Sequence, residues 1–196
     1  MAGSSKEEDR EMVSAFQAGS RAAFDRLVLK HKDRLVNLCY WFLGDYDEAS
    51  DAAQETFIKV YRSLKGFRFE SAFSTWLYRI AVNTCRNRVK SAEYRRRGET
   101  VSLDNPGAQG KADPPLEIRD ESRSPRAELE KKERLRLIKK AIDSLPAEQK
   151  AVVTLRDIEG LCYDEIATIT GFSLGTVKSR LARARLDLRK KLKGVV

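Results

Sequence analysis

Residues 163–185 read YDEIATITGFSLGTVKSRLARAR, and the spacing of small and apolar residues within them indicates how the C-terminal part of the chain folds. Within it, Ala167, Gly171 and Val177 stand at relative positions 0, +4 and +10. A helix-turn-helix needs a small residue where its two helices approach, a glycine in the turn and an apolar residue that docks the second helix. The stretch therefore predicts a helix on each side of a break at Gly171, the second from about Ser173 to Leu192.

The second of these helices is expected to have two different faces. Apolar residues recur along it at helical spacing and form the face predicted to be buried: Val177, Leu181, Ala184, Leu188 and Leu192. The other side carries the candidate contacts to duplex DNA: Thr176, Lys178, Ser179, Arg180, Arg183 and Arg185. Arginine can bind guanine O6 and N7 together, and the other side chains reach phosphates or base edges. A basic face that is merely solvated is the alternative, but residues 171–196 hold eight positive charges and one negative, which favours DNA.

Helical periodicity also dominates upstream, where strand-like alternation is not evident. The predicted helices run from about Glu7 to Ala18, from Phe24 to a stop at Gly44, from a cap at Asp47 to near Gly66, from about Ser74 onward, and from Pro146 to Gly160. Residues 95–130 interrupt this pattern with four of the five prolines, a composition that cannot supply a packed core. The predicted fold is all-α: a helical domain at 1–94, a flexible acidic linker at 95–130 and a helix-turn-helix domain at 131–196.

The charges of this 196-residue chain fall in blocks. Its net charge of +9 divides into −1 over residues 1–66, +6 over 67–98, −4 over 99–130 and +8 over 131–196. Two basic blocks around an acidic one predict two anion-binding surfaces.

The longest charge-free apolar stretch has ten residues, too few to span a bilayer, and the N-terminus is too charged for a signal peptide. We therefore expect a soluble, cytoplasmic protein.

The first basic block contains a second candidate site. Its predicted helix carries a polar face of Trp76, Arg79, Asn83, Arg86 and Lys90, which follows a loop rich in phenylalanine. Aromatic rings stack on unpaired bases, and amides reach their Watson–Crick edges, so this pattern favours single-stranded nucleic acid. Phe67, Phe73 and Trp76 taken alone are more typical of a core.

Enzymatic chemistry has little support in the sequence. The single histidine, His31, lies on an apolar helical stripe and is expected to be a packed residue. Three scattered cysteines are expected to be small apolar fillers, and the spacings typical of metal and nucleotide sites are missing from the sequence. We therefore expect no active site, cofactor or metal.

Taken together, the motifs resemble those of bacterial RNA polymerase sigma factors of the extracytoplasmic-function type (group IV of the sigma-70 family). The resemblance covers nearly the whole chain. It rests on four motifs in this order: Asp51-Ala-Ala-Gln-Glu-Thr-Phe-Ile-Lys-Val-Tyr, Phe73-Ser-Thr-Trp-Leu-Tyr-Arg-Ile-Ala-Val-Asn, Ser144-Leu-Pro, and Tyr163-Asp-Glu-Ile-Ala to Gly175-Thr-Val-Lys-Ser-Arg-Leu-Ala-Arg-Ala-Arg.

This resemblance implies a role for each domain. The first would be sigma region 2, which docks on the β′ clamp helices of core RNA polymerase through Asp51, Gln54, Glu55, Phe57 and Ile58. It would also recognise and melt the −10 element, holding a flipped base, through Phe67, Arg68, Phe69, Ser71, Ala72, Trp76, Arg79, Asn83, Arg86 and Asn87. The second would be region 4, which reads the −35 element of promoter DNA and contacts the β flap. Thr176, Lys178, Ser179 and Arg183 fall on its usual reading positions.

The resemblance further implies an anti-sigma factor as a partner, while the chain itself is expected to make no membrane contact. In one respect the sequence departs from the family pattern: many relatives have a glycine-aspartate pair where this chain has Phe69-Glu70. A larger side chain there is expected to reshape the base pocket.

Two other classes of protein are alternatives. A stand-alone helix-turn-helix regulator would usually dimerise on two half-sites, whereas this sequence has one reading helix and a second, different candidate surface. A DNA-processing enzyme such as a serine recombinase would need a nucleophilic serine on a strand beside arginines, and the sequence predicts no such strand.

Overall fold

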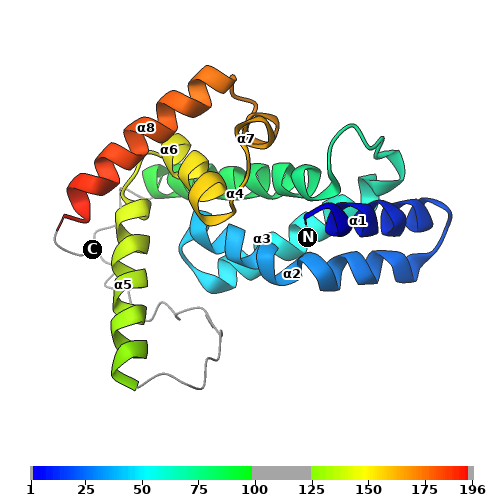
Figure 1. The fold of residues 1–196 in the computed structure, drawn as a ribbon, viewed down its shortest axis with the longest axis horizontal. Coiled ribbons are helices and arrows are strands. Elements are labelled where there is room, and N and C mark those ends of the chain that lie inside the picture. The colour runs from blue at the N-terminus through cyan, green and yellow to red at the C-terminus, as the bar shows by residue number, and fades with distance from the viewer. Residues whose placement is uncertain (1, 99–124, 194–196) are drawn as a thin grey trace. The chain divides into compact units, whose positions relative to one another are not determined.

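The computed structural model describes residues 2–98 and 125–193, and within these two ranges all regular structure is helical (Figure 1). The helices are α1 (Ala2–Gln17), α2 (Arg21–Leu43), α3 (Tyr46–Ser63), α4 (Phe73–Gly98), α5 (Pro125–Asp143), α6 (Ala147–Val153), α7 (Tyr163–Thr170) and α8 (Leu174–Lys191). In addition, a 3-10 turn, η1 (Leu64–Gly66), follows α3, and a π-helical turn, η2 (Thr154–Ile158), follows α6. The predicted all-α class is confirmed.

The described helices belong to two compact units. The first holds α1–α4, and the second holds α5, α6, α8 and most of α7. The linker expected at 95–130 differs from the structure at both ends, because α4 continues to Gly98 and α5 begins at Pro125. Proline is tolerated at the start of a helix, where its missing N–H has no intrahelical partner to lose. The rest of that expected linker, residues 99–124, lies outside the described residues.

Local chemistry explains the junction between α2 and α3. Gly44 ends α2 in the left-handed conformation, with φ +83°, and its N–H donates to the Tyr40 carbonyl at 2.9 Å. Asp45 caps α3, since its carboxylate accepts from the Glu48 N–H at 3.0 Å. The cap expected at Asp47 is therefore wrong by two residues. Asp47 lies in the first turn instead, where its charge favours the positive end of the helix dipole.

The core of the first unit forms along the apolar stripe of α2. Of the apolar positions at helical spacing, Val28 is only half-buried, and the others are buried as the spacing predicts: Leu27, His31, Leu35, Leu38, Cys39 and Phe42. Helix α1 packs beside α2 (Figure 1) and adds Met12, Val13 and Phe16 to the same core. Helix α4 contributes Leu77, Tyr78, Ala81, Val82 and Cys85. Burial of these side chains supplies the main driving force for folding.

His31 is packed, as expected, but it also has a polar partner that the sequence did not indicate. The Asp9 carboxylate, 3% exposed, lies 3.0 Å from His31 Nε2 and 2.9 Å from the Lys30 ammonium. Burial alone raises the pKa of Asp9, but the hydrogen bonds from His31 and Lys30 outweigh it, so the pKa lies below its usual value. This cluster fastens α1 to α2.

The second unit has its own core, built from α5, α6, η2, α7 and α8. Its buried side chains include Ile142, Leu145, Val152, Leu155, Ile166, Val177 and Leu181.

Cys162 is exposed, whereas Cys39 and Cys85 are buried. The expectation that all three cysteines are small apolar fillers is therefore wrong for Cys162, which lies in the short connection before α7. Among the described residues, no helix combines the length and apolar character needed to cross a bilayer.

Candidate nucleic-acid and protein interfaces

The helix-turn-helix forms where the residue spacing places it. Gly171 makes the turn with φ +75°, a conformation that only glycine adopts at no steric cost. Ser173 then caps α8, because its hydroxyl accepts from the Thr176 N–H at 3.2 Å. On the inner face of α8, Val177, Leu181 and Ala184 are buried, whereas Leu188 and Leu192 are only half-buried. The expected buried face therefore fades towards the C-terminal end of the helix.

Two of the six candidate −35 contacts are held by interactions within the second unit. Arg180 is half-buried: its Cζ lies 3.8 Å from the Phe172 ring centroid, and its NH2 lies 2.5 Å from a carboxylate oxygen of Glu148. Arg185 binds the Asp157 carboxylate with two nitrogens, at 3.1 and 2.5 Å. These hydrogen bonds raise the pKa of Arg185 above its usual value. Both guanidinium groups thus have a role in the protein that the sequence pattern did not reveal.

The other four candidates are arranged differently. Lys178, Ser179 and Arg183 are exposed, and within the described part of the chain the charged ends of Lys178 and Arg183 make no ion pair. Thr176 is half-buried, and its hydroxyl lies 2.8 Å from that of Ser173. Ser179 donates to the Thr176 carbonyl at 3.1 Å. The exposed positive charge beside the N-terminal half of α8 therefore comes from Lys178 and Arg183.

In the first unit, the loop between η1 and α4 is built on aromatic packing. Phe67 is only 8% exposed, and its ring lies 5.1 Å from that of Phe69 and 4.9 Å from that of Trp76, measured between centroids. The Gln17 amide donates to the Phe67 carbonyl at 2.9 Å and so anchors the loop to α1. Phe67 and Phe73 are core residues, as the alternative reading of the aromatic pattern proposed, while Trp76 is half-buried.

Phe69 has an unusual backbone conformation. With φ +57°, it is the only non-glycine residue in the left-handed region among those described. This conformation costs a residue with a Cβ about 1–2 kcal/mol. The ring rests against Phe67, and the Arg10 guanidinium lies over it, 5.3 Å from its centroid. Phe69, where many relatives have glycine, thus lies at a position whose backbone conformation favours glycine. The contacts of its ring with Phe67 and Arg10 offset the strain.

The remaining −10 candidates lie in the loop and along α4. Arg68 in the loop and Arg79, Asn83 and Asn87 on α4 are exposed. Ser71, Ala72 and Arg86 are half-buried. Helical spacing places Trp76, Arg79, Asn83 and Asn87 on one side of α4, which begins where the loop ends. Arg10, from α1, reaches Phe69 in the same loop. The sequence did not indicate this contact, because the two residues are far apart along the chain.

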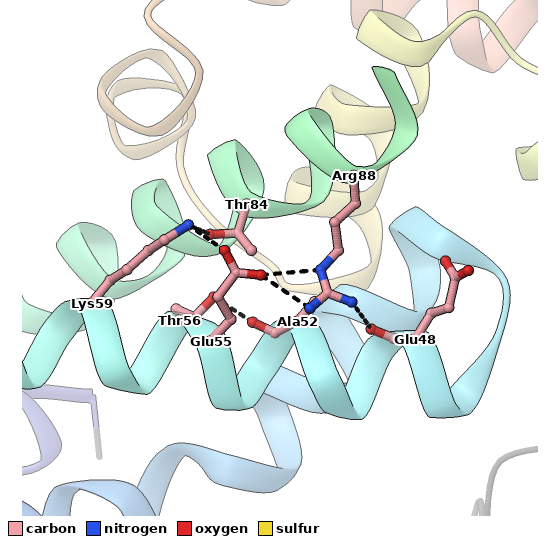
Figure 2. A network of polar contacts seen from close by, with 7 residues as sticks. All are labelled: Glu48, Ala52, Glu55, Thr56, Lys59, Thr84 and Arg88. Atoms are coloured by element: carbon pink, nitrogen blue, oxygen red, sulfur yellow. Dashed lines mark hydrogen bonds and ion pairs between the residues drawn. The ribbon is translucent and has the colours of Figure 1, made fainter. Parts of the chain in front are cut away.

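The candidate polymerase contacts lie on α3. Asp51, Gln54 and Ile58 are exposed, with Ile58 51% exposed, whereas Phe57 is half-buried. Glu55 differs from them, because both of its carboxylate oxygens have partners inside the first unit (Figure 2). Oε1 lies 2.7 Å from Lys59 Nζ, and Oε2 lies 3.0 Å from Arg88 NH2 on α4. The hydrogen bond from Lys59, opposed by burial and reinforced by Arg88, lowers the pKa of Glu55.

Comparison with known proteins matches both units. Residues 27–95 match the family described as Sigma-70 region 2, and residues 135–188 match Sigma-70, region 4. The RNA polymerase sigma-H factor of Pseudomonas aeruginosa is 38% identical over 95% of this chain and 95% of its own length. The ECF RNA polymerase sigma-E factor of Escherichia coli K12 is 34% identical over 96% of each chain.

Solved structures share the fold. CnrH, solved in complex with the cytosolic domain of CnrY, aligns over 95% of this chain and 98% of its own with a TM-score of 0.67 and 24% identity. The sigma factor RpoE of Bartonella quintana, solved with the anti-sigma factor NepR, aligns over 87% of this chain and 96% of its own with a TM-score of 0.66 and 24% identity.

The two helical units and their matched regions define a sigma-70 type transcription factor, which binds core RNA polymerase and promoter DNA. Within that class, the chain belongs to the extracytoplasmic-function family of RNA polymerase sigma factors. A stand-alone helix-turn-helix regulator is not favoured, since the relatives are sigma factors over nearly their whole length. A strand-borne nucleophilic serine, which the recombinase alternative requires, does not occur in residues 2–98 or 125–193.

Proposed function

We propose that α8 reads the −35 element of promoter DNA in the major groove through Lys178, Ser179 and Arg183, with Thr176 beside them. The observation that carries this proposal is the division of α8 into a buried face and an exposed basic edge. Arg183 is suited to bind guanine, because its guanidinium is exposed and free of ion pairs with other described residues. Arg180 and Arg185 instead position α8 through Phe172 and Asp157.

The loop after η1 and the exposed side of α4 are proposed to open and read the −10 element. Extruding a base costs a few kcal/mol, and stacking on an aromatic side chain returns ~1–3 kcal/mol. Trp76, half-buried at the edge of the aromatic cluster, is placed to provide such a stack, and Asn83 and Asn87 are exposed about two and three helical turns further along the same side of α4. Phe67 is too deeply buried for a direct stack and supports the loop from beneath.

The exposed residues of α3 are proposed to dock on the β′ clamp helices of core polymerase. Ile58 supplies an exposed apolar side chain, and Gln54 and Asp51 continue the same face of α3 towards its N-terminus with exposed polar groups. Protein interfaces combine apolar and polar groups in this way. The protein is proposed to act in the cytoplasm, with no active site of its own, and to be held inactive by an anti-sigma factor. The complex of RpoE of Bartonella quintana with the anti-sigma factor NepR supports this last proposal.

Promoter-dependent initiation tests this function. Purified chain and core RNA polymerase are combined on fragmented genomic DNA of the host, and run-off transcripts are sequenced. The proposal predicts transcripts that begin at a defined distance from one shared bipartite sequence and that are missing with core polymerase alone. Transcription that is the same with and without the chain would overturn it.

A further inference from the structure

A polar network joins the two helices to which separate tasks have been assigned, α3 and α4 (Figure 2). On α3, Glu55 and Lys59 form an ion pair four residues apart. Each also reaches α4: Glu55 accepts from Arg88 Nε at 3.2 Å and NH2 at 3.0 Å, and Lys59 donates to the Thr84 hydroxyl at 3.0 Å. Arg88 NH1 additionally reaches the Glu48 carbonyl at 3.5 Å. The network therefore holds α4 at two points one helical turn apart.

The two anchor points have a fixed relation to the proposed −10 residues. Thr84 and Arg88 directly follow Asn83 and Asn87 in the sequence. Successive residues of an α-helix are about 100° apart around the axis. Thr84 and Arg88 can therefore face α3 while Asn83 and Asn87 face outward. Asn83 and Asn87 are exposed, whereas Thr84 is buried and Arg88 half-buried. Any rotation of α4 that loosens the anchors turns both asparagines by the same angle.

Apolar packing alone does not fix that angle well. Helices α3 and α4 pack against each other, and the side chains that they bury include small and branched ones such as Ala53, Val60 and Ala81. Burial of such groups is favourable but has no directional preference. Arg88 places two guanidinium nitrogens, as a fork, on the single Glu55 oxygen Oε2, and hydrogen bonds of this kind do have a directional preference. Because Glu55 and Lys59 are both more than a third exposed, their ion pairs contribute little to global stability, which leaves orientation as their main effect.

The geometry points to Arg88 as a positioning residue for promoter opening, which acts by holding Glu55 and thereby the rotation of α4. This inference rests on the proposed roles of α3 and α4. It changes the role of Glu55, whose carboxylate is engaged inside the chain and orients the −10 face instead of providing a polymerase contact. It also makes α3 the support against which α4 is aligned.

A double-mutant cycle with Arg88→Gln and Glu55→Gln in the holoenzyme tests the inference. The substrate is a promoter fragment recovered by run-off transcription with the wild-type protein, and opening is followed by permanganate reactivity at saturating holoenzyme. Each single variant is expected to slow opening about threefold to tenfold, and the double variant no more than either one, because contacting residues are non-additive. Arg88→Lys, which keeps the charge but loses the fork, should restore part of the rate.

Three further measurements decide between this role and others. Arg26→Gln, the same change at an exposed arginine of α2, is the control and should open the promoter at the wild-type rate. Affinity for core polymerase and the unfolding midpoint should stay near wild type in all variants. Loss of affinity for core polymerase in Glu55→Gln would indicate that Glu55 contacts the polymerase directly, and it would overturn the inference. A slow Arg88→Gln with a normal Glu55→Gln would indicate a direct DNA contact and would also overturn it.

Failure of this inference differs from failure of the proposed function. If Arg88→Gln and Arg26→Gln open the promoter equally fast while the wild-type protein directs initiation, the positioning role is wrong and the sigma-factor function stands. If the wild-type protein directs no initiation, no promoter fragment is recovered and the proposed function itself fails.

Discussion

The Arg180 guanidinium lies over the Phe172 ring, with its Cζ 3.8 Å from the ring centroid, and also reaches the Glu148 carboxylate at 2.5 Å. A cation over an aromatic face and a charge-assisted hydrogen bond together hold this planar group in one orientation. Phe172 follows the turn glycine, and Glu148 lies in α6. Arg180 thus joins α8 to the turn and to α6, which is a structural role within a helix whose neighbouring basic residues are exposed.

Two arginines one turn apart should therefore respond differently to substitution. Arg183→Ala is expected to lose about 1–3 kcal/mol of discrimination at one −35 base pair and to leave the unfolding free energy unchanged. Arg180→Ala is expected to lower the unfolding free energy by about 0.5–2 kcal/mol and to keep the base preference. Urea unfolding and competition binding of holoenzyme to −35 variants measure the two effects. Equal loss of base preference in both variants would contradict this assignment.

Asn83→Ala should separate DNA opening from DNA binding. Asn83 is exposed on the side of α4 that carries Trp76, so its removal deprives an unpaired base of a hydrogen-bond partner. We expect permanganate reactivity at the −10 element to fall about tenfold, while holoenzyme affinity for the closed duplex stays within twofold, since a lost hydrogen bond to a base costs about 1–3 kcal/mol. Parallel loss of duplex affinity would contradict the prediction.

Acid stability should depend on Asp9. Its pKa is lowered in the folded protein, because His31 and Lys30 outweigh the opposing effect of burial. A carboxyl group of this kind stabilises the fold above its unfolded pKa, and the contribution is lost as pH falls through the folded pKa. Asp9→Asn should therefore cost about 1–3 kcal/mol at pH 7, and the difference from wild type should shrink below about pH 4. Urea unfolding from pH 7 to pH 3 measures it; a difference that grows on acidification would show that the sign is wrong.

Two glycines of the helix-turn-helix should give opposite results. Gly171 has φ +75° with open space around its α-carbon, so Gly171→Ala should cost about 1–2 kcal/mol through backbone strain alone. Gly175 has ordinary helical geometry and also has open space, so Gly175→Ala should stabilise the fold by up to about 1 kcal/mol. Thermal unfolding of both variants compares them. Stabilisation by Gly171→Ala would refute the assigned turn conformation.

Features that arise within one helix were predictable from the sequence. The stripe from Leu27 to Phe42, the turn at Gly171 and the two faces of α8 all follow from helical spacing and from the conformational freedom of glycine. Membership of the sigma-factor family was predictable as well, because four of its motifs occur in the expected order. These are local properties, and each leaves a periodic or compositional trace.

Contacts between distant segments were not predictable. Glu55 and Arg88 are 33 residues apart, and Asp9 and His31 are 22 apart. Neither spacing carries a pattern, since the partners meet only after the helices pack. The same holds for Arg180 and Arg185: their place on α8 resembled that of Arg183, and only the folded unit shows that Phe172, Glu148 and Asp157 hold them.

If the first unit opens the −10 element and the second reads the −35 element, a promoter whose −10 bases are already unpaired should distinguish their defects. Run-off transcripts are counted for wild-type, Asn83→Ala and Arg183→Ala holoenzymes on a fully duplex template and on one with mismatched −10 bases. We predict that the mismatch restores Asn83→Ala towards the wild-type level and leaves Arg183→Ala impaired, because only the first defect concerns strand opening. Restoration of both variants, or of Arg183→Ala alone, would contradict the account.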